Sequence, residues 1–187
     1  MTEKLNRREF LSLNFESTIG FLGNFIAPQI EVERNFFRPP GSCDELEFLT
    51  SCTRCGKCRE ICPEQSIRLF PIKSGAKLAQ TPYLDPNKSP CTLCKKCMDV
   101  CPTNALNNTD FDAKPNLGGY VKVLSDSCLG YQNVMCDYCV RSCPVSGALQ
   151  IVNGIPAVSN ENCTGCGICV SSCIAEGSAL KVIMIEN

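Results

Sequence analysis

The sequence predicts an α+β protein in which two small modules, built from short antiparallel hairpins and short helices, follow one another after an N-terminal extension. A quartet of cysteines recurs four times, and an internal repeat of this kind indicates repeated structural units. Strand-type segments flank the quartets, and a stretch with Pro and Gly, Asp110–Gly119, separates the second quartet from the third. We therefore expect an extension over residues 1–42, modules over 43–110 and 119–187, and a linker over 111–118.

Three of the quartets share the spacing C-x2-C-x2-C-x3-C. They are Cys52, Cys55, Cys58 and Cys62; Cys91, Cys94, Cys97 and Cys101; and Cys163, Cys166, Cys169 and Cys173. The third quartet in chain order ends in the same way but has a first interval of seven residues; it comprises Cys128, Cys136, Cys139 and Cys143. A proline follows the last cysteine of three quartets, at Pro63, Pro102 and Pro144, and Ile174 stands there in the fourth. Cys43 belongs to no quartet, and we expect it to be a structural or surface thiol.

Strand-type segments lie beside the quartets. The clearest pair flanks Asn153-Gly154, a dipeptide that favours a two-residue hairpin turn. The expected strands are Ser66–Phe70, Thr81–Leu84, Tyr120–Leu124, Ala148–Val152, Ile155–Val158 and Ala179–Ile185. We also expect a short helical turn after the fourth cysteine of each quartet.

The amino-acid composition excludes several kinds of functional site. Seventeen of the 187 residues are cysteine and none is histidine. The lack of histidine removes most catalytic zinc sites, Rieske centres and the usual general base. There is also no G-x-G-x-x-G or P-loop motif, and a formal net charge of −1 gives no indication of a nucleic-acid partner. The sequence therefore favours a metal-cluster protein without a substrate site of its own.

The cysteine spacing is typical of [4Fe–4S] clusters. In two-cluster ferredoxins, a C-x2-C-x2-C run holds one cluster and the fourth cysteine reaches the neighbouring cluster. This rule predicts four clusters on two tandem bacterial ferredoxin-like modules. The expected ligands are set 1 (Cys52, Cys55, Cys58, Cys101), set 2 (Cys62, Cys91, Cys94, Cys97), set 3 (Cys128, Cys136, Cys139, Cys173) and set 4 (Cys143, Cys163, Cys166, Cys169).

Other interpretations of the cysteines stay open at this point. A nested arrangement would pair the first quartet with the fourth and the second with the third. Zinc sites and disulfides fit less well, because zinc sites do not need a third cysteine at a further two-residue step and 17 cysteines cannot pair completely. Gly56, Gly165 and Gly167 are expected to let backbone N–H groups approach the cluster sulfides, the alternative being ordinary loop glycines.

The N-terminal segment contains a possible export signal. Asn6–Ser12 reads N-R-R-E-F-L-S, which resembles the twin-arginine signal with Ser12 in the place of the usual lysine. The apolar stretch that follows, Ile19–Ala27, is too short to span a membrane. We expect a periplasmic location, the alternatives being a cytoplasmic protein and an amphipathic segment that docks on a partner.

Residues 34–187 resemble the ferredoxin-type proteins of the NapG/MauM group, with NapF as a relative. The resemblance rests on R-P-P-G at Arg38–Gly41, on T-P-Y at Thr81–Tyr83, on the wide first interval of the third quartet, and on the motifs C-T-G-C-G and A-L-K-V that begin at Cys163 and Ala179. The regular second quartet is similar to that of NapF-like proteins. The resemblance implies electron relay between a quinol-oxidising membrane partner and a periplasmic reductase or dehydrogenase. The NapF-like alternative is a cytoplasmic accessory protein for metalloenzyme maturation.

Overall fold

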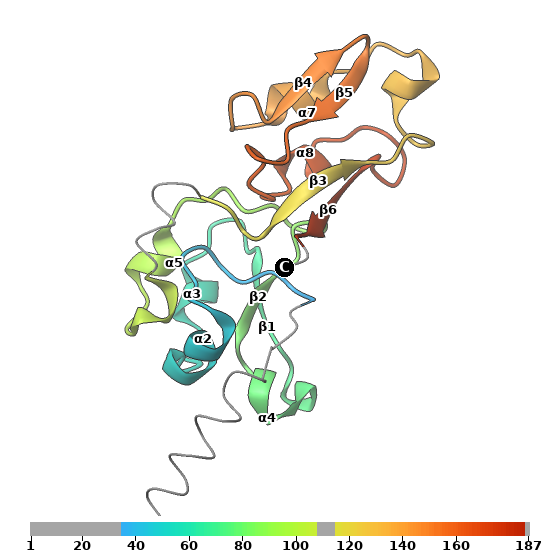
Figure 1. Ribbon diagram of the computed structural model, residues 1–187. Coiled ribbons are helices and arrows are strands. Elements are labelled where there is room, and N and C mark those ends of the chain that lie inside the picture. Colours follow the sequence, from blue (N-terminus) through green and yellow to red (C-terminus); the bar gives the residue numbers. More distant parts are fainter. Residues whose placement is uncertain (1–34, 108–114, 186–187) are drawn as a thin grey trace, which may run out of the picture. The chain divides into compact units, whose positions relative to one another are not determined.

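The computed structural model describes residues 35–107, which we call the first segment, and residues 115–185, which we call the second segment. Both fall within one compact unit of the chain. Each segment combines short helices with antiparallel strand pairs, as the prediction of an α+β fold requires (Figure 1). The motif at residues 6–12 lies outside the described residues.

The first segment has a single two-stranded sheet. Its elements are α2 (Glu45–Ser51), α3 (Lys57–Glu60), β1 (Ile67–Leu69), η2 (Ile72–Ser74), α4 (Gly75–Leu78), β2 (Pro82–Leu84), α5 (Lys96–Asp99) and η3 (Asn104–Leu106). Strand β1 runs antiparallel to β2, with Ile67 opposite Leu84. Phe37 extends this pairing through a bridge to Leu84, so the chain before the first quartet joins the edge of the sheet.

The second segment has two strand pairs. Its elements are β3 (Gly119–Val123), η4 (Leu129–Gln132), α7 (Tyr138–Ser142), β4 (Leu149–Val152), β5 (Ile155–Val158), α8 (Ile168–Ser171) and β6 (Leu180–Met184). Strand β3 pairs with β6 and places Val121 opposite Val182 in the core. Strands β4 and β5 form the hairpin expected at Asn153-Gly154, where both turn residues have positive φ, as a type I′ turn requires.

All six expected strands are present within a few residues, but the expected position of the helical turns is wrong. The short helices α3, α5, α7 and α8 each contain the third cysteine of a quartet and end before the fourth. Three of the fourth cysteines precede a proline, which disfavours helical backbone at the residue before it. Only a 3₁₀ turn, η3, follows a fourth cysteine closely.

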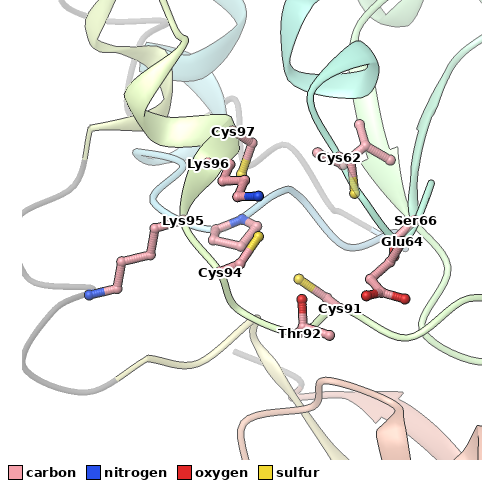
Figure 2. A pocket seen from close by; sticks show the side chains of 11 residues that line it. Cys62, Glu64, Ser66, Cys91, Thr92, Cys94, Lys95, Lys96 and Cys97 are labelled. Carbon is pink, nitrogen blue, oxygen red and sulfur yellow. The ribbon is translucent and has the colours of Figure 1, made fainter.

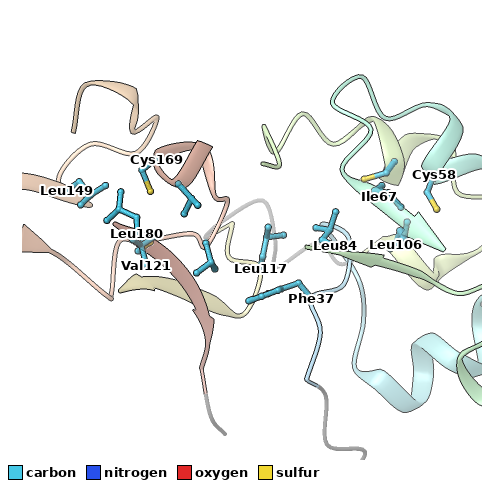
Figure 3. Packing of buried hydrophobic residues seen from close by; sticks show 14 of the residues in the cluster. Phe37, Cys58, Ile67, Leu84, Leu106, Leu117, Val121, Leu149, Cys169 and Leu180 are labelled. Atoms are coloured by element: carbon cyan, nitrogen blue, oxygen red, sulfur yellow. The ribbon is translucent and has the colours of Figure 1, made fainter. Parts of the chain in front are cut away.

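The hydrophobic core continues from one segment into the other. Figure 3 shows Phe37, Leu84 and Leu117 between the buried residues of the two segments, and all belong to one cluster of packed side chains. Leu117 lies in the expected linker and Phe37 in the expected extension, so both regions contribute to the core. Many of the remaining core positions are cysteines of the quartets, including Cys58 and Cys169. The sulfur atoms of the quartets therefore form part of the core.

Candidate metal-cluster sites

Three of the predicted sets each line one cavity. Set 1 lines a cavity of about 350 Å³ together with Phe48 and Leu106. Set 2 lines one of about 310 Å³, and Figure 2 shows its four sulfur atoms facing the same space while Lys95 points away. Set 3 lines one of about 360 Å³ beside Tyr138 and Ile174. The structure thus brings together the cysteines of neighbouring quartets, and the fourth cysteine comes from the other quartet each time.

For set 4 the evidence is electrostatic. Burial raises the pKa of the Cys169 thiol to about 12, and Cys166, Cys163 and Cys143 of the same set add to the rise, as does Cys139 of set 3. Burial also raises the pKa of Cys143, with further contributions from Cys166 and Cys163. The thiols of set 4 therefore lie within electrostatic range of one another and of Cys139.

Left-handed backbone between the cysteines aims N–H groups at the sulfur atoms. Arg54 and Leu93 have φ of 58° and 55°; burial raises the pKa of Cys52 and Cys91, and backbone hydrogen bonding at Arg54 and Leu93 opposes that rise. In the last quartet the N–H of Ala179 donates to the sulfur of Cys173 at 3.3 Å. N–H groups on cluster sulfurs help to set reduction potential. The expectation that small residues allow this approach is too narrow, because arginine and leucine occupy two of the positions.

Burial keeps several of these thiols protonated in the absence of metal. Burial raises the pKa of Cys58 and Cys91 to about 11 and that of Cys97 to about 12. Without metal these sulfur atoms hold protons near neutral pH, so incoming iron must displace the protons. Within the described segments, no three cysteine or acidic side chains converge closely enough to hold a single metal ion. The sulfur atoms surround a space instead, and a donor set of four thiolates around a mainly apolar cavity fits an iron–sulfur cluster.

Arg38 has a role beside set 1 that the cysteine pattern does not predict. Its guanidinium is almost fully buried and forms a two-point ion pair with Glu45, with N···O distances of 2.6 and 3.0 Å. It also donates to Thr81 Oγ1 at 3.0 Å and to the Pro82 carbonyl at 2.5 Å, and it stacks on Phe48. Its positive charge acts on Cys52, where it opposes the rise in pKa that burial causes. In the sequence, this role is indicated by the R-P-P-G motif at Arg38–Gly41 and by the acidic stretch after it, which contains Glu45.

Cys43 is separate from the four sets. Its thiol is half-buried and points to the carbonyl oxygen of Ala105 at 3.7 Å. Burial raises the pKa of this thiol, and the nearby carboxylate of Glu47 raises it further. A protonated, partly covered thiol is a poor nucleophile, which agrees with the expected structural role.

Comparison with known proteins identifies the family. A model of the 4Fe-4S dicluster domain matches residues 51–105, and a model of the 4Fe-4S binding domain matches residues 160–173. The methylamine utilization ferredoxin-type protein MauM of Methylorubrum extorquens is 33% identical over 174 residues, which cover 87% of this chain and 79% of that protein. The chain belongs to the ferredoxin-type iron–sulfur proteins of the MauM and NapG group.

Two further relatives show the breadth of this group. MauM of Methylobacillus flagellatus is 36% identical over 80% of this chain and 68% of its own length. The ferredoxin-type protein NapG of Escherichia coli is 35% identical over 80% of this chain and 71% of its own length. The MauM and NapG proteins therefore support iron–sulfur clusters and electron transfer in this chain. Among the described residues, no helix has the length and apolar character needed to cross a bilayer.

Proposed function

We propose that this MauM/NapG-type protein holds four [4Fe–4S] clusters, one on each cysteine set, and relays electrons between redox proteins without a substrate site of its own. The observation that supports the proposal is that three groups of four cysteines each line a separate cavity, while the thiols of set 4 interact electrostatically with one another. When bound, such clusters supply one-electron storage at potentials that the surrounding protein adjusts. The chain's own part is to hold the sulfur atoms, to direct N–H groups at them, and to cover them with apolar side chains.

Metal and sulfide analysis tests the number of clusters. Protein purified without oxygen should contain about sixteen iron and sixteen sulfide ions per chain, because each [4Fe–4S] cluster contributes four of each. Cys55→Ser should lower the iron content by up to a quarter and bleach part of the brown colour. Cys43→Ser is the matched control and should leave both unchanged, since Cys43 belongs to no set. A folded sample that is colourless, or that contains zinc in place of iron and sulfide, would contradict the proposal.

We also propose that the protein is exported by the twin-arginine route and receives electrons from a membrane-associated donor for a periplasmic reductase or dehydrogenase. The N-R-R-E-F-L-S sequence and the similarity to the NapG/MauM group support this proposal. A reporter that is active only in the periplasm, fused after residue 33, should be active, and replacing both Arg7 and Arg8 by Lys should abolish that activity. Retention of the unaltered fusion in the cytoplasm would favour the alternative of an accessory protein for metalloenzyme maturation.

A further inference from the structure

The first and second segments meet at the loop of the last quartet. The N–H of Cys91, in set 2, donates to the carbonyl oxygen of Cys166, in set 4, at 2.8 Å. Nearby, the side chain of Asn87 accepts from the N–H of Val182 at 2.7 Å and donates to its carbonyl at 3.0 Å. These bonds join residues far apart in the sequence, and one of them links two predicted cluster ligands directly.

The glycines of the last quartet are not explained by their backbone conformation alone. In each regular quartet, the residues on either side of the second cysteine have positive φ. Before it stand Arg54 (58°), Leu93 (55°) and Gly165 (68°), and after it stand Gly56 (75°), Lys95 (63°) and Gly167 (80°). Arginine, leucine and lysine therefore adopt this left-handed backbone in the other quartets. Another reason is needed for glycine at both positions of the last quartet.

That reason is the close approach of neighbouring backbone. A Cβ atom on Gly167 would overlap the carbonyl oxygen of Pro86, which belongs to the first segment. A Cβ atom on Gly165 would lie 2.8 Å from the carbonyl oxygen of Gly119, also too close. At Gly56, the position equivalent to Gly167 in the first quartet, the nearest atom would be a Leu69 methyl carbon at 3.7 Å, an ordinary contact.

We propose that Gly167 is a docking device that seats the loop of set 4 against the first segment and so holds set 2 and set 4 next to each other. This inference rests on the proposed function where it concerns electrons. Helix α3 packs on α5, so set 1 lies beside set 2. Helix α7 packs on α8, so set 3 lies beside set 4. The sets then follow in the order 1, 2, 4, 3. One electron crosses between the segments from set 2 to set 4 or back, oxidising one cluster and reducing the other, with no bond made or broken.

The test compares Gly167→Ala with Gly56→Ala in the full-length, cluster-loaded protein. Both substitutions impose left-handed backbone on alanine at equivalent positions, but only the first meets the Pro86 carbonyl. Hydrogen exchange measured by mass spectrometry should show exchange of the Cys91 amide faster by about tenfold or more in Gly167→Ala, because the hydrogen bond to Cys166 opens. Gly56→Ala should leave that amide as in the unaltered protein. Equal exchange in all three proteins, or equal acceleration in both variants, would overturn the docking role.

A second variant covers the case in which Gly167→Ala does not fold. Asn87→Ala leaves the last quartet intact and removes the two bonds to Val182, so it should also speed exchange at Cys91 while iron and sulfide contents stay unchanged. Unchanged exchange at Cys91 in this variant would count against the proposed interface.

A kinetic measurement tests the route of the electron. After a pulse that adds less than one electron per chain, redistribution among clusters should be slower in Gly167→Ala than in Gly56→Ala. If the two variants redistributed electrons at equal rates although the Cys91 amide exchanged faster in Gly167→Ala, the proposed electron route would be overturned. The docking role of Gly167 would still stand. If the unaltered protein contained no iron and sulfide, the proposed function would fail, and the exchange experiment would still decide on the docking.

Discussion

The buried ion pair between Arg38 and Glu45 gives the sharpest prediction about stability. Both side chains are nearly inaccessible to water, with exposed fractions of 1% and 8%, and the shorter N···O distance is 2.6 Å. Replacing Arg38 by Ala leaves the Glu45 carboxylate without its two-point partner and removes the donors to Thr81 and Pro82. Breaking a buried pair from one side costs about 3–5 kcal/mol. At roughly 2–4 °C per kcal/mol for a domain of this size, the melting temperature should fall by roughly 6–20 °C.

The measurement is the apparent melting temperature of the cluster-loaded protein, followed by circular dichroism without oxygen. A fixed heating rate is needed, because loss of clusters makes unfolding irreversible. Arg141→Ala is the matched control. Arg141 also pairs with a carboxylate, that of Asp137 at 3.1 Å, and also lies over an aromatic ring, but its side chain is 70% exposed. An exposed pair contributes about 1 kcal/mol or less, so this control should lose less than about 4 °C.

Two outcomes would refute the reasoning. Equal losses in Arg38→Ala and Arg141→Ala would show that burial of the first pair has no effect on stability. The double variant with Arg38→Met and Glu45→Leu should recover much of the loss, because replacing a buried ion pair by apolar side chains of similar volume is often neutral. A double variant no more stable than Arg38→Ala would show that the charges themselves are not the cause.

Three further predictions concern packing, metal and potential. Gly119→Ala places a Cβ atom 2.7 Å from the Ile183 carbonyl oxygen and 2.6 Å from the Phe37 ring, so overpacking should cost about 1–3 kcal/mol in denaturant unfolding; an unchanged midpoint would contradict this. Removing iron with a chelator should abolish the circular dichroism of the folded state, since the thiols of the four sets fill much of the core; a fully folded apo-protein would contradict it. A reduction titration followed by EPR should resolve more than one midpoint potential, because Cys55 and Cys94 are exposed while Cys166 is buried; a single midpoint for all clusters would oppose this.

The parts of the fold that depend on local pattern could be predicted, and the parts that depend on distant contacts could not. Asn153-Gly154 fixed the hairpin of β4 and β5, since both residues accept the positive φ of its turn. The cysteines that line each of the three cavities are those that the spacing groups as sets 1, 2 and 3. The helical turns lie before the fourth cysteines and not after them, and in three quartets the proline that follows disfavours helical backbone at that cysteine. Nothing local in the sequence indicates the hydrogen bond from the N–H of Cys91 to the carbonyl oxygen of Cys166, because a bond between main-chain groups does not depend on the side chains of the two residues.

The contact between the segments also changes the surroundings of one cluster site. The loop of the last quartet is covered where it meets the first segment, and its second cysteine, Cys166, is buried, whereas the equivalent Cys55 and Cys94 are exposed. Burial in a medium of low polarity disfavours added negative charge. If the proposed clusters are present, a reduced cluster on set 4 would be stabilised less by water than clusters on sets 1 and 2, although the spacing of their first three cysteines is the same. The packing that joins the segments would then make the proposed cluster sites unequal, so that the potential of each site would follow from its neighbours in the fold rather than from its motif.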